Sequence, residues 1–174
     1  MSSNAVLRGR SAAVVFSTRF GTTERVAKAL ERGLISSGMQ TSCQSIREVT
    51  PESLKRYDLV CLGGPTEVFG ATKPMKEFLE ALSGVDLEGK FAFAFDTKLD
   101  SRLSGSAAKF IEHALDDDGL HIAARRESAI VTSRKEGGKI VGADLREGEE
   151  RRFEELGLKV GATAAEEMTK VRGV

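Results

Sequence analysis

The sequence is poor in residues that many binding and anchoring functions require. Of its 174 residues none is tryptophan, one is tyrosine and two are cysteine. Lysine plus arginine and aspartate plus glutamate number 26 each, so the formal net charge is zero. A chain without excess cations is a poor candidate for a general nucleic-acid binder, which must displace phosphate counterions. No run approaches the roughly 20 apolar residues of a membrane span.

The start of the chain and the two cysteines indicate a cytoplasmic protein. The first ten residues lack the apolar core of a signal peptide. Cys43 and Cys61 lie in apolar-leaning segments, and neither His113 nor His121 is near them in the sequence. Metal sites usually need clustered cysteine or histidine ligands. We therefore expect two reduced thiols, no metal site, and neither a secretory leader nor a membrane span.

Short apolar runs alternate with helical patterns along the chain. The run at 11–17 is nearly continuous, which suits a strand buried on both faces of a parallel sheet. At 90–96 Phe and Ala alternate, so one face of that strand is bulky and the other is small. We predict strands at 11–17, 40–46, 57–63, 90–96 and 121–132, the last interrupted or split in two, and helices at 22–37, just after 50, 74–82, 105–117 and 147–171.

This alternation predicts an α/β fold with a doubly wound parallel sheet and helices on both faces. We expect residues 1–10 to be a loose lead-in and residues 11–174 to form a single domain. Gly157 and Gly161 fall inside the last helix, where each costs roughly 1 kcal/mol relative to Ala. A close approach of this helix to the sheet would compensate. Ligands of such sheets bind beyond the carboxyl ends of the strands, so the loops there are the informative ones.

The loop after the first strand is rich in hydroxyl groups. It reads Ser17-Thr18-Arg19-Phe20-Gly21-Thr22-Thr23-Glu24 and ends at a helix N-terminus. Unpaired N–H groups and the helix dipole favour an anion there. Neither the P-loop pattern nor G-x-G-x-x-G is present. A phosphate site and an ordinary helix cap both remain open as readings of this loop.

Two further loops follow the central strands. Gly63-Gly64-Pro65-Thr66-Glu67-Val68-Phe69-Gly70 places a Phe in a glycine-flanked loop, where an exposed ring can stack on a flat ligand or tuck back into the core. Asp96-Thr97-Lys98-Leu99 offers hydrogen-bonding groups, although a lone loop Asp is usually solvated or caps a helix. These residues complete the candidate binding edge.

Together the first two loops resemble the flavodoxin family. Thr18 to Thr23 looks like the hydroxyl-rich loop that holds the FMN phosphate in those proteins, and Ser17-Thr18-Arg19 with Gly21 also resembles flavodoxin-type protoporphyrinogen oxidases. Pro65-Thr66 followed by Phe69-Gly70 is similar to a loop of flavodoxin-like quinone reductases, with one extra residue here. The spacing of helices and strands matches from about Ser11 to Val171.

The resemblance implies a five-stranded sheet of order 2-1-3-4-5 that binds one FMN, with the flavin carrying the chemistry and no catalytic residue from the chain. It assigns Thr18, Gly21, Thr22 and Thr23 to the phosphate, with Arg19 offsetting its charge; Pro65, Thr66, Glu67, Val68, Phe69 and Gly70 to the ring; and Asp96, Thr97 and Lys98 to its pyrimidine edge. Whether Phe20 or Phe69 stacks on the ring is left open.

The sequence departs from the family pattern in its aromatic residues and in its net charge, which is zero here whereas flavodoxins are commonly acidic. Glu67 stands near a position where flavodoxins often have Trp, and the third loop has no aromatic residue. Three functions follow from the resemblance. The first is an electron carrier between a redox partner protein and another molecule. The second is a flavin-dependent oxidoreductase acting on a quinone or porphyrinogen through an open flavin face. The third is a flavin-free interaction module.

Overall fold

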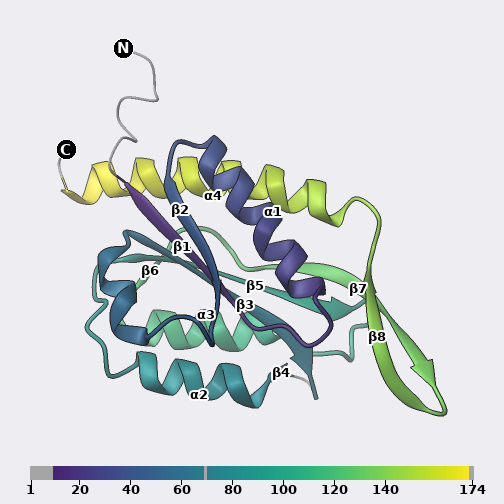
Figure 1. Cartoon of the computed structure of the whole chain (residues 1–174). Coiled ribbons are helices and arrows are strands. Elements are labelled where there is room, and N and C mark those ends of the chain that lie inside the picture. The colour runs from purple at the N-terminus through teal and green to yellow at the C-terminus, as the bar shows by residue number, and fades with distance from the viewer. Residues whose placement is uncertain (1–9, 69, 173–174) are drawn as a thin grey trace.

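Strands and helices alternate as the hydrophobic spacing predicts (Figure 1). The computed structural model describes residues 10–68 and 70–172, so the predicted lead-in at 1–10 lies outside the described residues except for Arg10. The elements are β1 (Ser11–Phe16), α1 (Thr22–Ser36), β2 (Gln40–Ser45), the 3-10 helix η2 (Pro51–Arg56), β3 (Leu59–Glu67), β4 (Gly70–Ala71), α2 (Lys73–Leu82), β5 (Phe91–Leu99), α3 (Ala107–Asp117), β6 (His121–Ile122), β7 (Glu127–Glu136), β8 (Lys139–Leu145) and α4 (Glu149–Arg172).

The central sheet confirms the predicted parallel core. Its strands follow the order β2-β1-β3-β5-β7-β8, and the first five of these are parallel to their neighbours, which is the order 2-1-3-4-5. The predicted interruption in the fifth strand is also present, because β6 and β7 both pair with β5. The strand count was too low: the described residues form eight strands, and β4 and β8 run antiparallel to β3 and β7.

Two helical layers bury the two faces of the sheet. Helices α1 and α4 cover one face, and α2 and α3 cover the other (Figure 1). Phe93 and Phe95 point into the α1–α4 layer, whereas Ala92 and Ala94 belong to the core on the α2–α3 side. The predicted bulky and small faces of β5 are therefore confirmed, and the small face lets α3 lie close to the sheet.

The glycines of α4 serve a helix–helix contact, so the expected approach to the sheet was wrong. A Cβ at Gly157 would lie 2.4 Å from the carbonyl oxygen of Leu30 and 3.0 Å from the Cα of Gly33, both on α1. A Cβ at Gly161 would lie 2.1 Å from the Ser37 hydroxyl. The two backbones meet at this crossing, where no side chain fits between them.

The strands also extend beyond their predicted ends. β3 continues to Glu67 and turns back as β4, so most of the predicted second loop is a strand and a tight turn. β5 continues to Leu99, and β7 continues to the Gly137–Gly138 turn and returns as β8. We refer to β7 and β8 as the β7–β8 hairpin. The predicted strand at 121–132 covers only the first part of β7, and β8 was not predicted. Among the described residues, no helix is both long and apolar enough to cross a membrane.

Candidate functional site

Two adjoining cavities open at the edge of the sheet where the parallel strands end. One, of about 110 Å³, has mostly apolar walls, and we call it the apolar cavity; it is lined by Arg19, Phe20, Thr22, Pro65, Thr66, Glu67, Thr97, Lys98, Leu99, Val131, Ser133, Ile140 and Ala143. The other, of about 470 Å³, is the polar cavity, lined by Ser17, Thr18, Arg19, Ser45, Ile46, Arg47, Pro65, Glu67, Thr72 and Pro74. Arg19, Pro65 and Glu67 line both, so the two cavities share a wall.

The first loop is shaped by a glycine and by its own hydroxyl groups. Gly21 has a φ of 87° and is the N-cap of α1, a conformation that favours glycine. Its N–H donates to the Thr18 hydroxyl at 2.9 Å, which closes the loop. Thr22 lines the apolar cavity. Thr23 is buried, and its hydroxyl lies 2.9 Å from that of Thr97, so it ties α1 to β5 beneath the cavities.

Ser17 is a candidate that the sequence analysis left out of its site. Its side chain lines the polar cavity, and its buried hydroxyl has no hydrogen-bond partner among the described residues. A buried hydroxyl without a partner costs free energy unless a ligand or water satisfies it. A Cβ at Gly64 would lie 2.6 Å from this oxygen, so only glycine fits beside the hydroxyl on the β3 side. The position of Ser17 at the start of the hydroxyl-rich loop is the sequence feature that could have identified it as a site residue.

The second segment meets the first loop through an ion pair. Arg19 and Glu67 lie 3.6 Å apart, with both side chains well exposed, so this pair contributes little to stability. The Arg19 guanidinium also lies over the Phe20 ring, 4.7 Å from its centroid. Pro65 and Thr66 line the apolar cavity beside them. The structure thus brings these five predicted residues together around the apolar cavity.

The β3–β4 turn stands out from the molecule. Val68 has a φ of 41° and is almost fully exposed, an uncommon backbone conformation for a β-branched residue. Gly70 is partly buried in β4 and lines neither cavity. Phe69, one of the two candidates for stacking on the ring, lies outside the described residues.

Asp96 is a buried residue near the end of β5. Its side chain is fully buried, and one carboxylate oxygen accepts hydrogen bonds from the Thr66 hydroxyl at 3.1 Å, the Ser106 hydroxyl at 2.8 Å and the Ala108 N–H at 2.9 Å. These contacts fix the N-terminus of α3 to the ends of β3 and β5. Asp96 lines neither cavity, whereas the following Thr97 and Lys98 line the apolar one.

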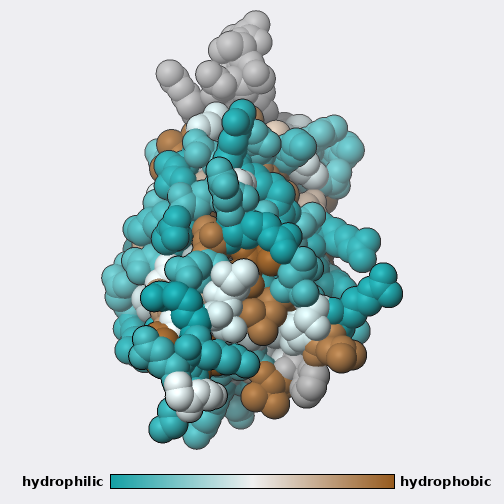
Figure 2. All heavy atoms as spheres, turned by 90° about the vertical axis from the view of Figure 1, so that its right-hand side faces the viewer, coloured by the Kyte–Doolittle hydropathy of each residue, from teal (hydrophilic) through white to brown (hydrophobic). Residues whose placement is uncertain are grey.

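The β7–β8 hairpin supplies the far wall of the apolar cavity, which the sequence analysis missed. Four of its side chains line that cavity: Val131, Ser133, Ile140 and Ala143. Figure 2 looks onto this end of the molecule and shows apolar surface gathered in the middle and lower part of the face. Phe20, Leu99 and Ile140 line the apolar cavity, and each is about two-fifths exposed. The Gly137–Gly138 pair between two strand-forming segments was the available signal for a hairpin.

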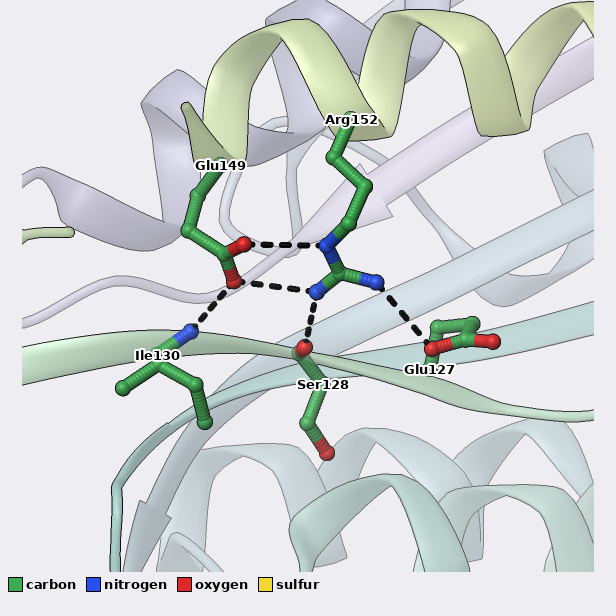
Figure 3. A network of polar contacts seen from close by, with 5 residues as sticks. All are labelled: Glu127, Ser128, Ile130, Glu149 and Arg152. Carbon is green, nitrogen blue, oxygen red and sulfur yellow. Dashed lines mark hydrogen bonds and ion pairs between the residues drawn. The ribbon is translucent and has the colours of Figure 1, made fainter. Parts of the chain in front are cut away.

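A network of polar contacts anchors the base of this hairpin to α4 (Figure 3). Arg152 donates to both oxygens of Glu149, to Glu127 and to the carbonyl of Ser128, and Glu149 accepts from the N–H of Ile130 at 2.7 Å. Burial raises the pKa of Glu149, but the hydrogen bonds from Arg152 and Ile130 outweigh it, so this pKa lies below its usual range. The ionised carboxylate therefore holds β7 against the first turn of α4.

The two cysteines have poorly reactive thiols: Cys61 is buried and Cys43 is half-buried. Both pair in register with Val14 of β1, Cys43 from one side and Cys61 from the other. Two strand spacings of about 4.8 Å separate them, too far for a disulfide. Burial and the nearby Glu31 raise the pKa of Cys43 to about 12, and burial raises the pKa of Cys61 as well. In the described part of the chain, no group of three His, Cys, Asp or Glu side chains is placed to hold a metal ion.

Comparisons with known proteins agree with this geometry. The family model described as Flavodoxin matches residues 14–156. A flavodoxin of Clostridium saccharobutylicum is 32% identical over 85 residues, which are 48% of this chain and 53% of that protein. The match thus spans about half the length of the curated relative.

Solved structures share the fold at low sequence identity. A flavodoxin from the domain Archaea superposes with a TM-score of 0.71 and 20% identity, over 88% of this chain and 98% of its own. The flavodiiron protein of Giardia intestinalis superposes with a TM-score of 0.70 and 19% identity, over 94% of this chain and 39% of its own. These likenesses concern the fold, and the cavities lie where its strands end.

Proposed function

This chain belongs to the flavodoxin family, and on that premise we propose that it binds one FMN and carries electrons between partner molecules. The observation that carries the proposal is the buried Ser17 hydroxyl in the loop before α1, which has no hydrogen-bond partner within residues 10–68 and 70–172 and lies in the segment that the family model matches. Bound FMN supplies the electron-accepting and electron-donating chemistry, so the chain needs no catalytic residue of its own.

The first loop suits the FMN phosphate. Hydroxyl groups of Ser17, Thr18 and Thr22 and the unpaired N–H groups of the first turn of α1 are donors for phosphate oxygens. Arg19 and Arg47 line the polar cavity and offset the negative charge. Thr23 was assigned to the phosphate as well, but its hydroxyl already pairs with Thr97, so we propose that it supports the loop instead.

The apolar cavity suits the flavin ring. It lies between the ends of β3 and β5, the two segments that the resemblance assigns to the ring. Pro65, Thr66 and Glu67 form one side of it, and Thr97 and Lys98 form another. A flat aromatic ligand gains free energy by burial against such apolar walls.

Adding FMN and riboflavin to the purified protein tests the proposal. We expect FMN to bind and its visible band to change. We expect Ser17→Ala and Thr18→Val each to weaken FMN about 10- to 100-fold, since a hydrogen bond to a charged group is worth about 1.5–3 kcal/mol. Riboflavin, which lacks the phosphate, should respond little. Thr41→Val on β2, whose hydroxyl donates to Met39, is the control and should change neither affinity.

The result decides among the functions that the sequence leaves open. No spectral change at micromolar FMN would reject both redox functions and favour a flavin-free module. Weakening of riboflavin equal to that of FMN would remove the phosphate role from the first loop. We further propose a cytoplasmic location, which fractionation of the producing cells tests directly.

A second candidate is an enzyme that reduces a small quinone-like or porphyrinogen-like molecule. The apolar rim formed by Phe20, Leu99 and Ile140 favours it, because such a rim can dock a flat apolar substrate beside the flavin. Steady oxidation of NAD(P)H in the presence of a quinone would support the enzyme. Fast single-turnover exchange with a redox protein and no steady turnover would support the carrier.

A further inference from the structure

We propose that the β7–β8 hairpin is a wall of the flavin site and that Ile140 packs against the ring, in the role for which this chain has no tryptophan or nearby tyrosine. The inference rests on the proposed function and identifies the part of the chain that contacts the flavin ring. It concerns a segment that the predicted binding loops did not include.

The lining of the apolar cavity places the hairpin there. Ser133 and Ala143 are direct partners in the β7–β8 register, and both line the cavity together with Val131 and Ile140. Pro65 and Glu67 at the end of β3 line the same cavity. The hairpin and the end of β3, which lie on either side of β5 in the sheet, thus both contribute to its walls.

A bulge turns Ile140 toward the cavity. Arg134 pairs with Gly142, but Lys135 pairs with Ile140, so the register skips Val141. Strict alternation from Ala143 would turn Val141 to the cavity, and the bulge substitutes Ile140. Ile140 lines the cavity and Val141 does not, although both are exposed to a similar degree.

The other face of the hairpin is polar and braced. A Cβ at Gly142 would lie 2.5 Å from the Arg134 guanidinium, so the absence of a side chain lets Arg134 lie across the strand and pair with Asp144 at 3.0 Å. Arg146, just after β8, pairs with Asp100, just after β5, at 2.6 Å. Together with the Arg152 network at its base, these contacts hold the hairpin in place against β5.

Matched substitutions at the two neighbouring residues test the proposal. Ile140→Ser should weaken both FMN and riboflavin about 10-fold in titrations of the flavin-free protein, because the ring is common to both ligands. Ile140→Val should stay within about 2-fold of the parent protein. Val141→Ser is the control and should bind both flavins as the parent does. Thermal unfolding of each variant, recorded without flavin, should show that all remain folded.

The outcomes separate this inference from the proposed function. If the parent protein binds FMN and Ile140→Ser binds it as tightly, the proposed contact between the hairpin and the ring is rejected, whereas the proposal that the protein binds FMN stands. The same holds if Val141→Ser loses as much affinity as Ile140→Ser. A loss of FMN affinity with unchanged riboflavin affinity would place Ile140 at the phosphate and would also reject the proposed contact with the ring. If the parent protein binds neither flavin, both proposals fall.

Discussion

At the scale of single residues, Gly21 carries a conformational demand that no side chain could meet cheaply. Its φ of 87° lies in the left-handed region, and a Cβ there would meet nothing within 4 Å. Gly21→Ala should therefore lower the free energy of unfolding by about 1 kcal/mol through backbone strain alone. Urea denaturation measures this, with Gly70→Ala, which has equal space and no positive φ, as a near-neutral control.

Substitutions of Asp96 can separate a structural role at the N-terminus of α3 from a role in binding FMN. Three hydrogen bonds reach its buried carboxylate, so Asp96→Ala should lower the free energy of unfolding by about 3 kcal/mol. Asp96→Asn keeps the shape and should cost less, with FMN affinity close to that of the parent protein. A folded Asp96→Asn variant with much weaker FMN binding would restore the role at the ring edge that the sequence resemblance assigned.

At the scale of elements, the backbones of α1 and α4 lie so close at their crossing that a side chain at Gly157 would not fit between them. Gly157→Ala would place a methyl group 2.4 Å from the Leu30 carbonyl oxygen, so the helices must separate. Overpacking of this kind costs about 1–3 kcal/mol, and we expect a lower unfolding midpoint in urea with an unchanged slope. Gly84→Ala, whose nearest atom would lie at 3.5 Å, should leave the midpoint almost unchanged.

The link between α4 and β7 should depend on pH. The pKa of Glu149 is lower in the folded protein than its usual value of about 4.3, so its stabilising effect is full above that value and is lost as the pH falls through the folded pKa. Glu149→Gln should therefore destabilise the protein by about 1–2 kcal/mol at pH 7. Denaturation at pH 7 and pH 3 checks this, since a deficit that persists unchanged in acid would contradict an ionic role.

The elements also show what sequence patterns can and cannot reveal. The Phe–Ala alternation of β5 predicted which face is bulky, because burial acts directly on side-chain size. The end of β3 was predicted as a loop, since its glycine and proline suggest a turn and its pairing with β5 is a long-range contact. Ile140 gave no signal at all, because its direction depends on a bulge that only the register reveals.

At the scale of the whole molecule, bound FMN should raise thermal stability. A ligand that binds only the folded state at 100 times its Kd adds about 2.7 kcal/mol, which for a domain of this size is roughly 5–10 °C in Tm. Scans at increasing FMN concentration measure this, and riboflavin should give a smaller rise at equal concentration. An unchanged Tm at saturating FMN would contradict binding to the native state.

The two outer ends of the fold lie together, away from the cavities. The Arg10 guanidinium donates to the Thr169 hydroxyl of α4 at 3.0 Å, and Figure 1 shows the start of β1 and the end of α4 on the side opposite the β7–β8 hairpin. A second module fused at either end, or a surface to which the protein is tethered there, would leave the cavity edge facing outward. The closeness of Arg10 to α4 suits circular permutation, in which a short linker joins the start of β1 to the end of α4 and new termini open elsewhere.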